Sequence, residues 1–158
     1  GGVAFTITVT NAPIQVKIAQ IVQAQAQEAG FKVTIKQIDA TGLLAVLQNA
    51  DFDACWAPWS GRPDPDLNMF NYFTLKGSNN FARYTSEKVD GLLQKARGTL
   101  DQAERAKLYQ QAQAQIAEDA PLVFFHHDAI LQAAAKSVMG FEQYPDGGFR
   151  LEDVWVKK

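Results

Sequence analysis

Residues 59–66 read Trp-Ser-Gly-Arg-Pro-Asp-Pro-Asp and bring together an aromatic ring, a hydroxyl group, a guanidinium group and two carboxylates. This mixture suits a small polar or zwitterionic ligand that stacks on the Trp59 indole and places a carboxylate against Arg62. An amine of the same ligand could lie near an aspartate. The alternative is a surface turn whose aspartates cap the next helix and whose tryptophan is buried, and both interpretations stay open. The candidate ligand-binding residues of this segment are Trp59, Ser60, Gly61, Arg62 and Asp64.

A second polar segment, residues 77–84, contains amide side chains and an arginine between two aromatic residues. Asn80 and Arg83 could line the same cleft as residues 59–66. The alternative is a loop whose serine and asparagines form turns while Phe81 and Tyr84 pack, and this alternative is favoured for any single residue. Arg83 could equally be the partner of a structural ion pair.

The other chemistry-bearing residues form no recognisable catalytic or metal site. His126 and His127 end a predicted strand, where neighbouring side chains point to opposite faces, so they cannot readily share a metal ion. Cys55 has no candidate base near it and is expected to behave as a small hydrophobe. No triad, nucleophile elbow or phosphate-binding glycine loop is visible. We therefore predict a protein that is not an enzyme and has no metal or cofactor. A hydrolase using the aspartates around the loop would need a carboxylate of strongly perturbed pKa in a cleft.

The elements that must position these residues alternate between strands and helices in the first half of the chain. Asn11 as a capping residue and Pro13 in the first turn predict the start of a helix, and Gly30 predicts its end. Right-handed crossovers would connect the flanking strands in parallel. The pattern predicts an α/β fold of βαβ units, with a largely parallel sheet flanked by helices. The predicted strands are residues 4–10, 31–36 and 52–56, and the predicted helices are residues 13–29 and 41–49.

Residues 59–66 leave the carboxyl end of the third predicted strand, the edge where ligands usually bind in open α/β sheets. The second half of the chain is predicted to be mainly helical, with Asp101 and Glu104 as a capping pair. Pro121 ends the last helix and starts an apolar strand. The predicted elements of this half are a short turn at residues 67–73, helices at 86–97 and 101–118, and a strand at 122–125, with a further strand considered for residues 128–135.

The composition of the 158 residues fits a globular domain, with 47% hydrophobic and 20% charged residues. A net charge of −2 argues against a nucleic-acid binder, which would normally carry a basic stripe. No apolar run reaches the roughly 18 residues that a membrane span needs. The single cysteine excludes an internal disulfide framework. No signal peptide is visible at the start of the sequence.

Several short segments follow one another in a recognisable order and spacing. They are a strand-helix-strand unit over residues 6–38, the segments 51–53, 59–66, 80–84, 89–93, 103–105, 108–113 and 120–122, Phe141, and the closing segment 151–155. In this order the chain resembles the C-terminal part of the periplasmic solute-binding proteins of peptide, nickel and glutathione ABC importers, family 5 of the bacterial extracellular solute-binding proteins. The resemblance covers nearly the whole chain, and it rests on the order of the segments rather than on any single motif.

The resemblance implies one lobe of a type II periplasmic-binding-protein-like fold, within a longer two-lobed protein that closes on its ligand. Residues 1–127 would form the later half of the second ligand-binding lobe, and residues 128–158 a C-terminal tail that returns to the first lobe. The chain would then be a fragment or an isolated lobe, which would explain the missing signal peptide. The resemblance further implies an ABC permease as partner and a periplasmic or extracytoplasmic location.

The resemblance also bears on the ligand. The stretch that begins at Trp59 matches residues that line the cleft in relatives, and dipeptide and oligopeptide binders carry an aspartate at the place of Arg62. A guanidinium there favours a carboxylate or another anionic group. We therefore expect capture of a peptide-like or carboxylate-bearing solute, such as a modified peptide or a glutathione-like molecule. The alternative is a stand-alone module that forms a homodimer through its glutamine-rich helix (residues 102–115) and its tail, without a small ligand.

Overall fold

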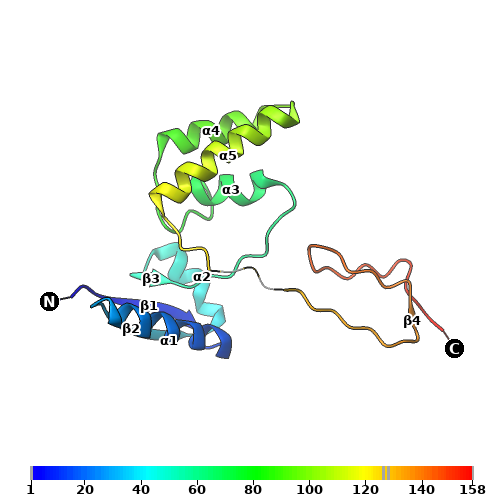
Figure 1. The fold of residues 1–158 in the computed structure, drawn as a ribbon, viewed down its shortest axis with the longest axis horizontal. Coiled ribbons are helices and arrows are strands. Elements are labelled where there is room, and N and C mark those ends of the chain that lie inside the picture. The colour runs from blue at the N-terminus through cyan, green and yellow to red at the C-terminus, as the bar shows by residue number, and fades with distance from the viewer. Residues whose placement is uncertain (1, 126, 128, 158) are drawn as a thin grey trace. The chain divides into compact units, whose positions relative to one another are not determined.

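The computed structural model describes residues 2–125, 127 and 129–157. The chain divides into two compact units. Figure 1 shows its helices and strands coloured in chain order. The first unit is Gly1–Trp59 with Phe81–Arg83, and the second is Ser60–Asn80 with Tyr84–Lys158. The division predicted at residue 128 concerns the place of the tail in a longer protein, and it stays a prediction.

The first unit is built on a three-stranded parallel sheet. Its strands are β1 (Ala4–Thr10), β2 (Lys32–Ile38) and β3 (Ala54–Cys55), in the spatial order β2-β1-β3. The register pairs Ala4 with Lys32 along β1 and β2, and Ile7 with Ala54 along β1 and β3. The central strand β1 is the most buried of the three because it has a neighbour on both sides. The predicted parallel α/β arrangement is confirmed.

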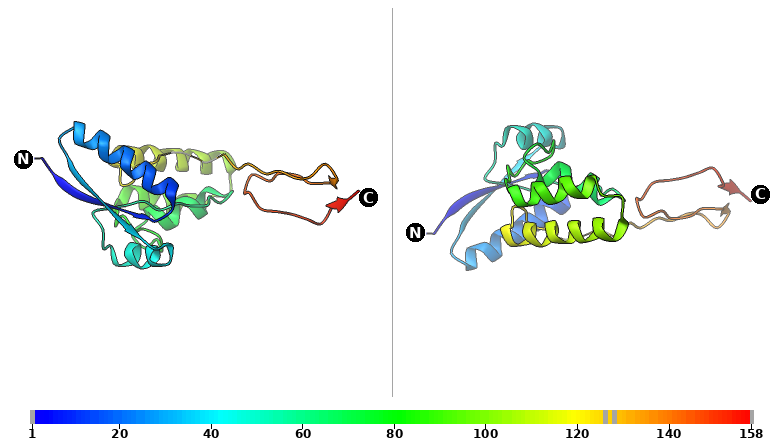
Figure 2. Two further views of the ribbon diagram at one scale, coloured as in Figure 1. Left: turned by 90° about the horizontal axis from the view of Figure 1, so that it is seen from below. Right: turned by 90° about the horizontal axis from the view of Figure 1, so that it is seen from above.

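Two helices connect these strands, α1 (Pro13–Glu28) and α2 (Ala40–Asn49). The connections leave β1 and β2 in opposite directions across the sheet, so right-handed crossovers place the two helices on opposite faces. Figure 2 shows α1 and α2 on either side of the strands. Gly30 has φ +87°, as expected for the residue that lets the chain leave α1. The buried core of this unit is Ile7, Val9, Ala19 and Val33.

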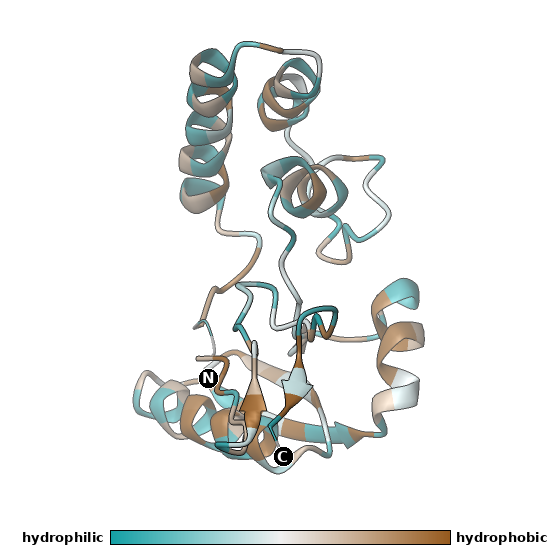
Figure 3. Cartoon of the chain, turned by 90° about the vertical axis from the view of Figure 1, so that its right-hand side faces the viewer, coloured by the Kyte–Doolittle hydropathy of each residue, from teal (hydrophilic) through white to brown (hydrophobic). Residues whose placement is uncertain are grey.

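The second unit contains three helices, α3 (Pro65–Phe73), α4 (Glu87–Arg97) and α5 (Gln102–Asp119). Each helix carries both hydrophobic and hydrophilic residues (Figure 3), as a helix with one buried face should. Their apolar faces form one core of Phe73, Val89, Leu93, Ala96, Leu108, Tyr109, Ala112 and Ile116.

The predicted capping residues have different outcomes. The predicted cap Asp101 accepts a hydrogen bond from the Glu104 amide at the start of α5. Ser86, for which no cap was predicted, accepts one from the Val89 amide at the start of α4. Asn11 is not the cap of α1, so this prediction is wrong. Ala12 occupies the capping position, and the Asn11 side chain instead donates to Asp39, 3.3 Å away.

The predicted third strand is shorter than expected, because only residues 54 and 55 pair with β1. At the preceding position the Asp53 carboxylate, rather than a backbone carbonyl, accepts the hydrogen bond from the Thr6 amide, at 2.8 Å. The ladder therefore begins at Ala54, although the Trp56 amide still donates to the Thr8 carbonyl. The turn predicted at residues 67–73 is the helix α3, which begins two residues earlier at Pro65.

Residues 122–125 do not form the predicted strand, and residues 129–135 do not form the strand considered there. An extended segment becomes a strand only when its backbone pairs with a neighbour, and among the described residues these segments have none. His126 and Asp128 lie outside the described residues. Later in the tail, β4 (Val138–Met139) and β5 (Trp155–Val156) pair antiparallel. Within the described part of the chain, no helix has the length and apolarity to cross a membrane.

Candidate functional site

The candidate loop connects β3 to α3 and belongs to both units, so its residues are described unit by unit. Trp59 is the last residue of the first stretch of the first unit, and its side chain is 45% exposed. Ser60, Gly61, Arg62 and Asp64 belong to the second unit. The expectation of a buried tryptophan is therefore not met, and Trp59 keeps a ring surface in contact with solvent.

Arg62 is exposed and its guanidinium folds back on the loop. Its Nη1 donates to the Ser60 carbonyl at 2.9 Å and to the Ser60 hydroxyl at 3.2 Å. These two contacts link two of the predicted ligand-binding residues. They also fix the direction of a long side chain that would otherwise sample many rotamers.

The Asn68 side chain holds the backbone of Arg62 from α3. Its Oδ1 accepts from the Arg62 amide at 2.8 Å, and its Nδ2 donates to the Arg62 carbonyl at 2.6 Å. The same Nδ2 donates to the Asp64 carbonyl at 3.3 Å. One amide side chain in the first turn of α3 thus satisfies backbone groups of both Arg62 and Asp64, on either side of Pro63.

Asp64 caps α3 and forms an ion pair with α5. Its Oδ1 accepts from the Asp66 amide at 2.8 Å and from Arg105 Nη2 at 2.7 Å. The hydrogen bond from Arg105 is the main cause that lowers the pKa of the Asp64 carboxyl, and the bond from the Asp66 amide adds to it. The contacts of Asp64 are therefore those of a helix cap, and its carboxylate keeps its charge at neutral pH.

A second ion pair joins α3 to α4. Arg97 donates to Asp66 through Nε at 3.1 Å and through Nη2 at 2.8 Å, which is the two-pronged geometry of a guanidinium on a carboxylate. The Arg97 guanidinium also lies 3.5 Å from the centre of the Phe70 ring. The two aspartates at the start of α3 are therefore each held by an arginine from a different helix.

Tyr72 on α3 is bonded to one of the two segments that the sequence singled out and lies in the electrostatic field of the other. Its side chain is hydrogen bonded to Asn79, and the Arg62 charge acts on its phenol, while burial is the main cause that raises its pKa. The Tyr72 phenol is therefore bonded to the second polar segment and feels the charge of the first, within the second unit. The phenol stays neutral at physiological pH and can both donate and accept a hydrogen bond.

The Asn80 side chain is hydrogen bonded within the loop between α3 and α4. Its Nδ2 donates to the Thr74 carbonyl at 3.1 Å and to the Tyr84 carbonyl at 2.8 Å, and its Oδ1 accepts from the Tyr84 amide at 2.9 Å. Arg83, within this closed loop, is exposed and has φ +53°, in the left-handed region. Gly77 is required by space, since an added Cβ would lie 2.3 Å from the Asn71 carbonyl oxygen.

Asn68, Tyr72 and Arg105 are the residues that the sequence did not single out. A helical periodicity marks α3 and α5, but it does not reveal which polar residue faces a loop that is distant in sequence. For Asn68 a signal existed, because an asparagine four residues after a capping aspartate can reach back to the loop before it. For Arg105 the partner is 41 residues away, and only the fold brings the two together.

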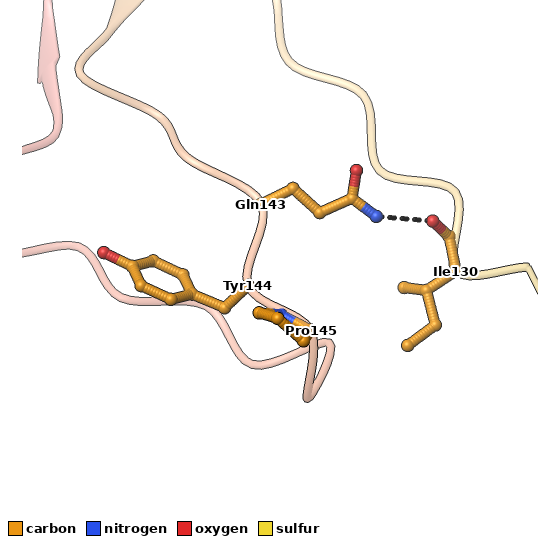
Figure 4. A pocket seen from close by; sticks show the side chains of 4 residues that line it. All are labelled: Ile130, Gln143, Tyr144 and Pro145. Carbon is orange, nitrogen blue, oxygen red and sulfur yellow. Dashed lines mark hydrogen bonds between the residues drawn. The ribbon is translucent and has the colours of Figure 1, made fainter. Parts of the chain in front are cut away.

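The described residues contain no group of three histidine, cysteine or acidic side chains that could hold a metal ion. Cys55 is half-buried, and burial raises the pKa of its thiol, which keeps it protonated. An open hollow of about 370 Å³ lies in the tail, lined by Ile130, Gln143, Tyr144 and Pro145 (Figure 4). Gln143 donates to the Ile130 carbonyl there at 2.6 Å, and none of the predicted ligand-binding residues lines this hollow.

Comparison with known proteins decides which family has this arrangement. Residues 1–81 match the family model described as "Bacterial extracellular solute-binding proteins, family 5 Middle". The chain belongs to family 5 of the bacterial extracellular solute-binding proteins. The matched part of this family 5 chain contains six of the seven predicted ligand-binding residues, all except Arg83.

Curated relatives of the family 5 chain carry the names of binding proteins. It is 31% identical over 144 residues to the "Probable di/tripeptide-binding protein 5" of Pseudomonas aeruginosa, covering 89% of this chain and 27% of that protein. It is 31% identical over 147 residues to the "Glutathione-binding protein GsiB" of Pectobacterium atrosepticum, covering 87% of this chain and 29% of that protein. The chain thus spans between a quarter and a third of the length of these relatives.

Solved structures confirm the fold of the family 5 chain. The periplasmic binding protein DppA from Helicobacter pylori, in complex with the peptide STSA, aligns with a TM-score of 0.80 and 26% identity, over 99% of this chain and 32% of that chain. HbpA2 from Haemophilus parasuis aligns with a TM-score of 0.78 and 26% identity over the same shares. The predicted periplasmic-binding-protein fold is therefore confirmed.

Proposed function

We propose that this chain is part of a non-catalytic, extracytoplasmic solute-binding protein that captures a peptide-like or other small polar solute for an ABC importer. Membership of family 5 is the observation that carries this proposal. The names of the relatives, which refer to dipeptides, tripeptides and glutathione, support the substrate class. The net charge of −2 supports a small-molecule ligand rather than a nucleic acid.

The mechanism we propose is closure of two lobes on the ligand. A ligand that contacts both lobes stabilises the closed state over the open one by the free energy of the additional contacts. This chain would contribute one side of the cleft, and an ABC permease would receive the solute from the closed protein. An isolated lobe would bind weakly, because it makes only part of the contacts and leaves the ligand open to water.

The ligand-contacting residues we propose are those at the exposed start of the loop. The Trp59 ring offers a stacking surface, Ser60 and Gly61 offer polar backbone groups, and Arg62 offers a guanidinium for a carboxylate. Asp64 and Asn80 contribute by holding the loops, since their side chains are bonded within the second unit. Arg83 is exposed, and we propose it as a further contact for an anionic group.

Calorimetric titration of the longer two-lobed protein with dialanine, trialanine and reduced glutathione tests this proposal. Replacing Arg62 by alanine should weaken binding of the preferred carboxylate-bearing ligand by about ten- to hundredfold, since a charge-assisted pair is lost. The matched control is Arg150→Ala, which removes an exposed arginine of the tail that pairs with Asp146. Unchanged affinity of the Arg62 variant for every carboxylate-bearing ligand would rule out the assigned role. A stable dimer without response to any ligand would favour the homo-oligomeric module instead.

A further inference from the structure

A continuous series of hydrogen bonds leads from the backbone of Arg62 to the buried core of the second unit. Asn68 bonds both the amide and the carbonyl of Arg62, and it also donates to the Asp64 carbonyl. The Asp64 carboxylate accepts from Arg105 Nη2 at 2.7 Å. Arg105 Nη2 in turn donates to the Tyr109 hydroxyl at 3.1 Å, and Tyr109 is 7% exposed.

The members of this series differ in how firmly they are held. Tyr109 lies in the core of the three helices, so its hydroxyl is a fixed point. Arg105 sits on α5, and its side chain is 28% exposed, which shields it partly from solvent. The Arg105 guanidinium, held by its hydrogen bond to the Tyr109 hydroxyl, therefore holds the Asp64 carboxylate in place at the end of an otherwise exposed loop.

We propose that Arg105 is a positioning residue for the candidate loop and holds Arg62 in one geometry before a ligand arrives. The ion pair with Asp64 fixes the carboxyl-terminal end of the loop. The hydrogen bonds of Asn68 to the Asp64 carbonyl and to the Arg62 amide and carbonyl then hold the Arg62 backbone as well. A loop ordered in advance loses less conformational entropy on binding. The predicted effect of Arg105 on ligand affinity rests on the function proposed above, whereas its predicted effect on the order of the loop does not.

The second ion pair, between Arg97 and Asp66, holds a different part of the chain. Asp66 lies within the first turn of α3, and its carboxylate accepts hydrogen bonds from Arg97 Nε and Nη2 on α4. Loss of this pair is therefore expected to loosen the contact between α3 and α4, with a smaller effect on Arg62. The exchange rate of the Arg62 amide therefore distinguishes loss of Arg105 from loss of Arg97.

Amide hydrogen exchange followed by NMR on the 158-residue chain tests the proposal without any ligand. The Arg62 amide, which donates to Asn68, should exchange about three- to fivefold faster in Arg105→Met than in the wild type. Amides in the middle of α4 and α5 should keep their exchange rates, since a merely structural loss would accelerate all of them together. Arg105→Lys, which keeps a positive charge on α5, should restore part of the protection.

The matched control is Arg150→Met, which removes an ion pair of similar length, 2.8 Å, from the tail. This control should leave the Arg62 amide unchanged. If Arg105→Met does not fold, Asp64→Asn decides, because asparagine keeps the helix cap but removes the charge. An Arg62 amide that exchanges at the wild-type rate in a folded Arg105→Met or Asp64→Asn variant overturns the proposal.

A titration of the longer protein with reduced glutathione provides the second arm. If the wild type binds, Arg105→Met should bind about threefold or more weakly, although residue 105 is not one of the proposed ligand contacts. If the wild type does not bind and the Arg62 amide still loses protection, the positioning role stands and reduced glutathione is not the ligand. If the wild type binds and Arg105→Met binds equally well, the positioning role in binding is wrong.

Discussion

Asn80 closes the loop between α3 and α4 with three hydrogen bonds to backbone groups of Thr74 and Tyr84. Replacing it by alanine leaves those partly buried groups without their partner. We expect Asn80→Ala to lower the free energy of unfolding by about 2 kcal/mol, measured by urea denaturation of the chain. Ser78→Ala is the control, because Ser78 makes one long hydrogen bond at the surface, and it should change stability by less than about 0.5 kcal/mol. Equal effects of the two changes would contradict this account.

The Asp64 carboxyl makes stability depend on pH in a defined direction. Because Arg105 lowers its pKa in the folded state, the unfolded state takes up the proton first as the pH falls. The stabilising contribution is therefore present above about pH 4, the usual pKa of an aspartate, and is lost as the pH falls through the lowered value. The difference in stability between the wild type and Asp64→Asn should shrink between pH 7 and pH 3, as measured by thermal unfolding. A difference that stays constant over this range would exclude the contribution of the pair.

At the residue scale, the sequence predicted the kinds of groups but not their pairing. Asp64 could be a ligand contact or a helix cap, and both interpretations were consistent with a carboxylate next to a proline. Its contact with Arg105 depends on how α5 packs against α3, which local spacing does not contain. Tyr72 was missed for the same reason, since nothing in residues 67–73 indicates that its hydroxyl faces Asn79.

The helices of the second unit are stabilised by one shared core. Leu93 on α4 is completely buried, whereas Leu100, just beyond the same helix, is completely exposed. Leu93→Ala should cost about 2–5 kcal/mol of stability, through lost apolar burial and the cavity left behind. Leu100→Ala, the same chemical change without burial, should stay within about 0.5 kcal/mol in the same thermal unfolding experiment. A similar loss from both variants would mean that this core is packed differently.

At the element scale, periodicity predicted α1, α2, α4 and α5 but gave only a short turn for α3. The prediction was clearest for α4 and α5, which bury faces whose apolar residues recur three and four positions apart. The strands β1 and β2 were predicted from alternation, and both exist because each pairs with a neighbour along its full length. The strand predicted at residues 122–125 does not form, because this pairing is missing. Its apolar residues satisfied the local pattern, but no partner strand stands beside them among the described residues.

At the scale of the whole molecule, the chain spans only a quarter to a third of the length of its relatives. If the proposed two-lobed function holds, we expect the 158-residue chain by itself to bind the proposed ligand about a hundredfold more weakly than the longer protein, because contacts from the proposed second lobe would be missing. Calorimetry with reduced glutathione on both proteins measures the ratio. Equal affinities would contradict closure of two lobes as the mechanism.

The crystal structure of the longer protein with the carboxylate-bearing ligand that titration selects tests the central claim most directly. The account predicts a ligand carboxylate within hydrogen-bond distance of the Arg62 guanidinium, and an apolar or planar part of the ligand against the Trp59 ring. It also predicts that Arg105 and Asp64 stay within about the 2.7 Å of the present structure. A ligand that contacts none of residues 59–62 would contradict the claim.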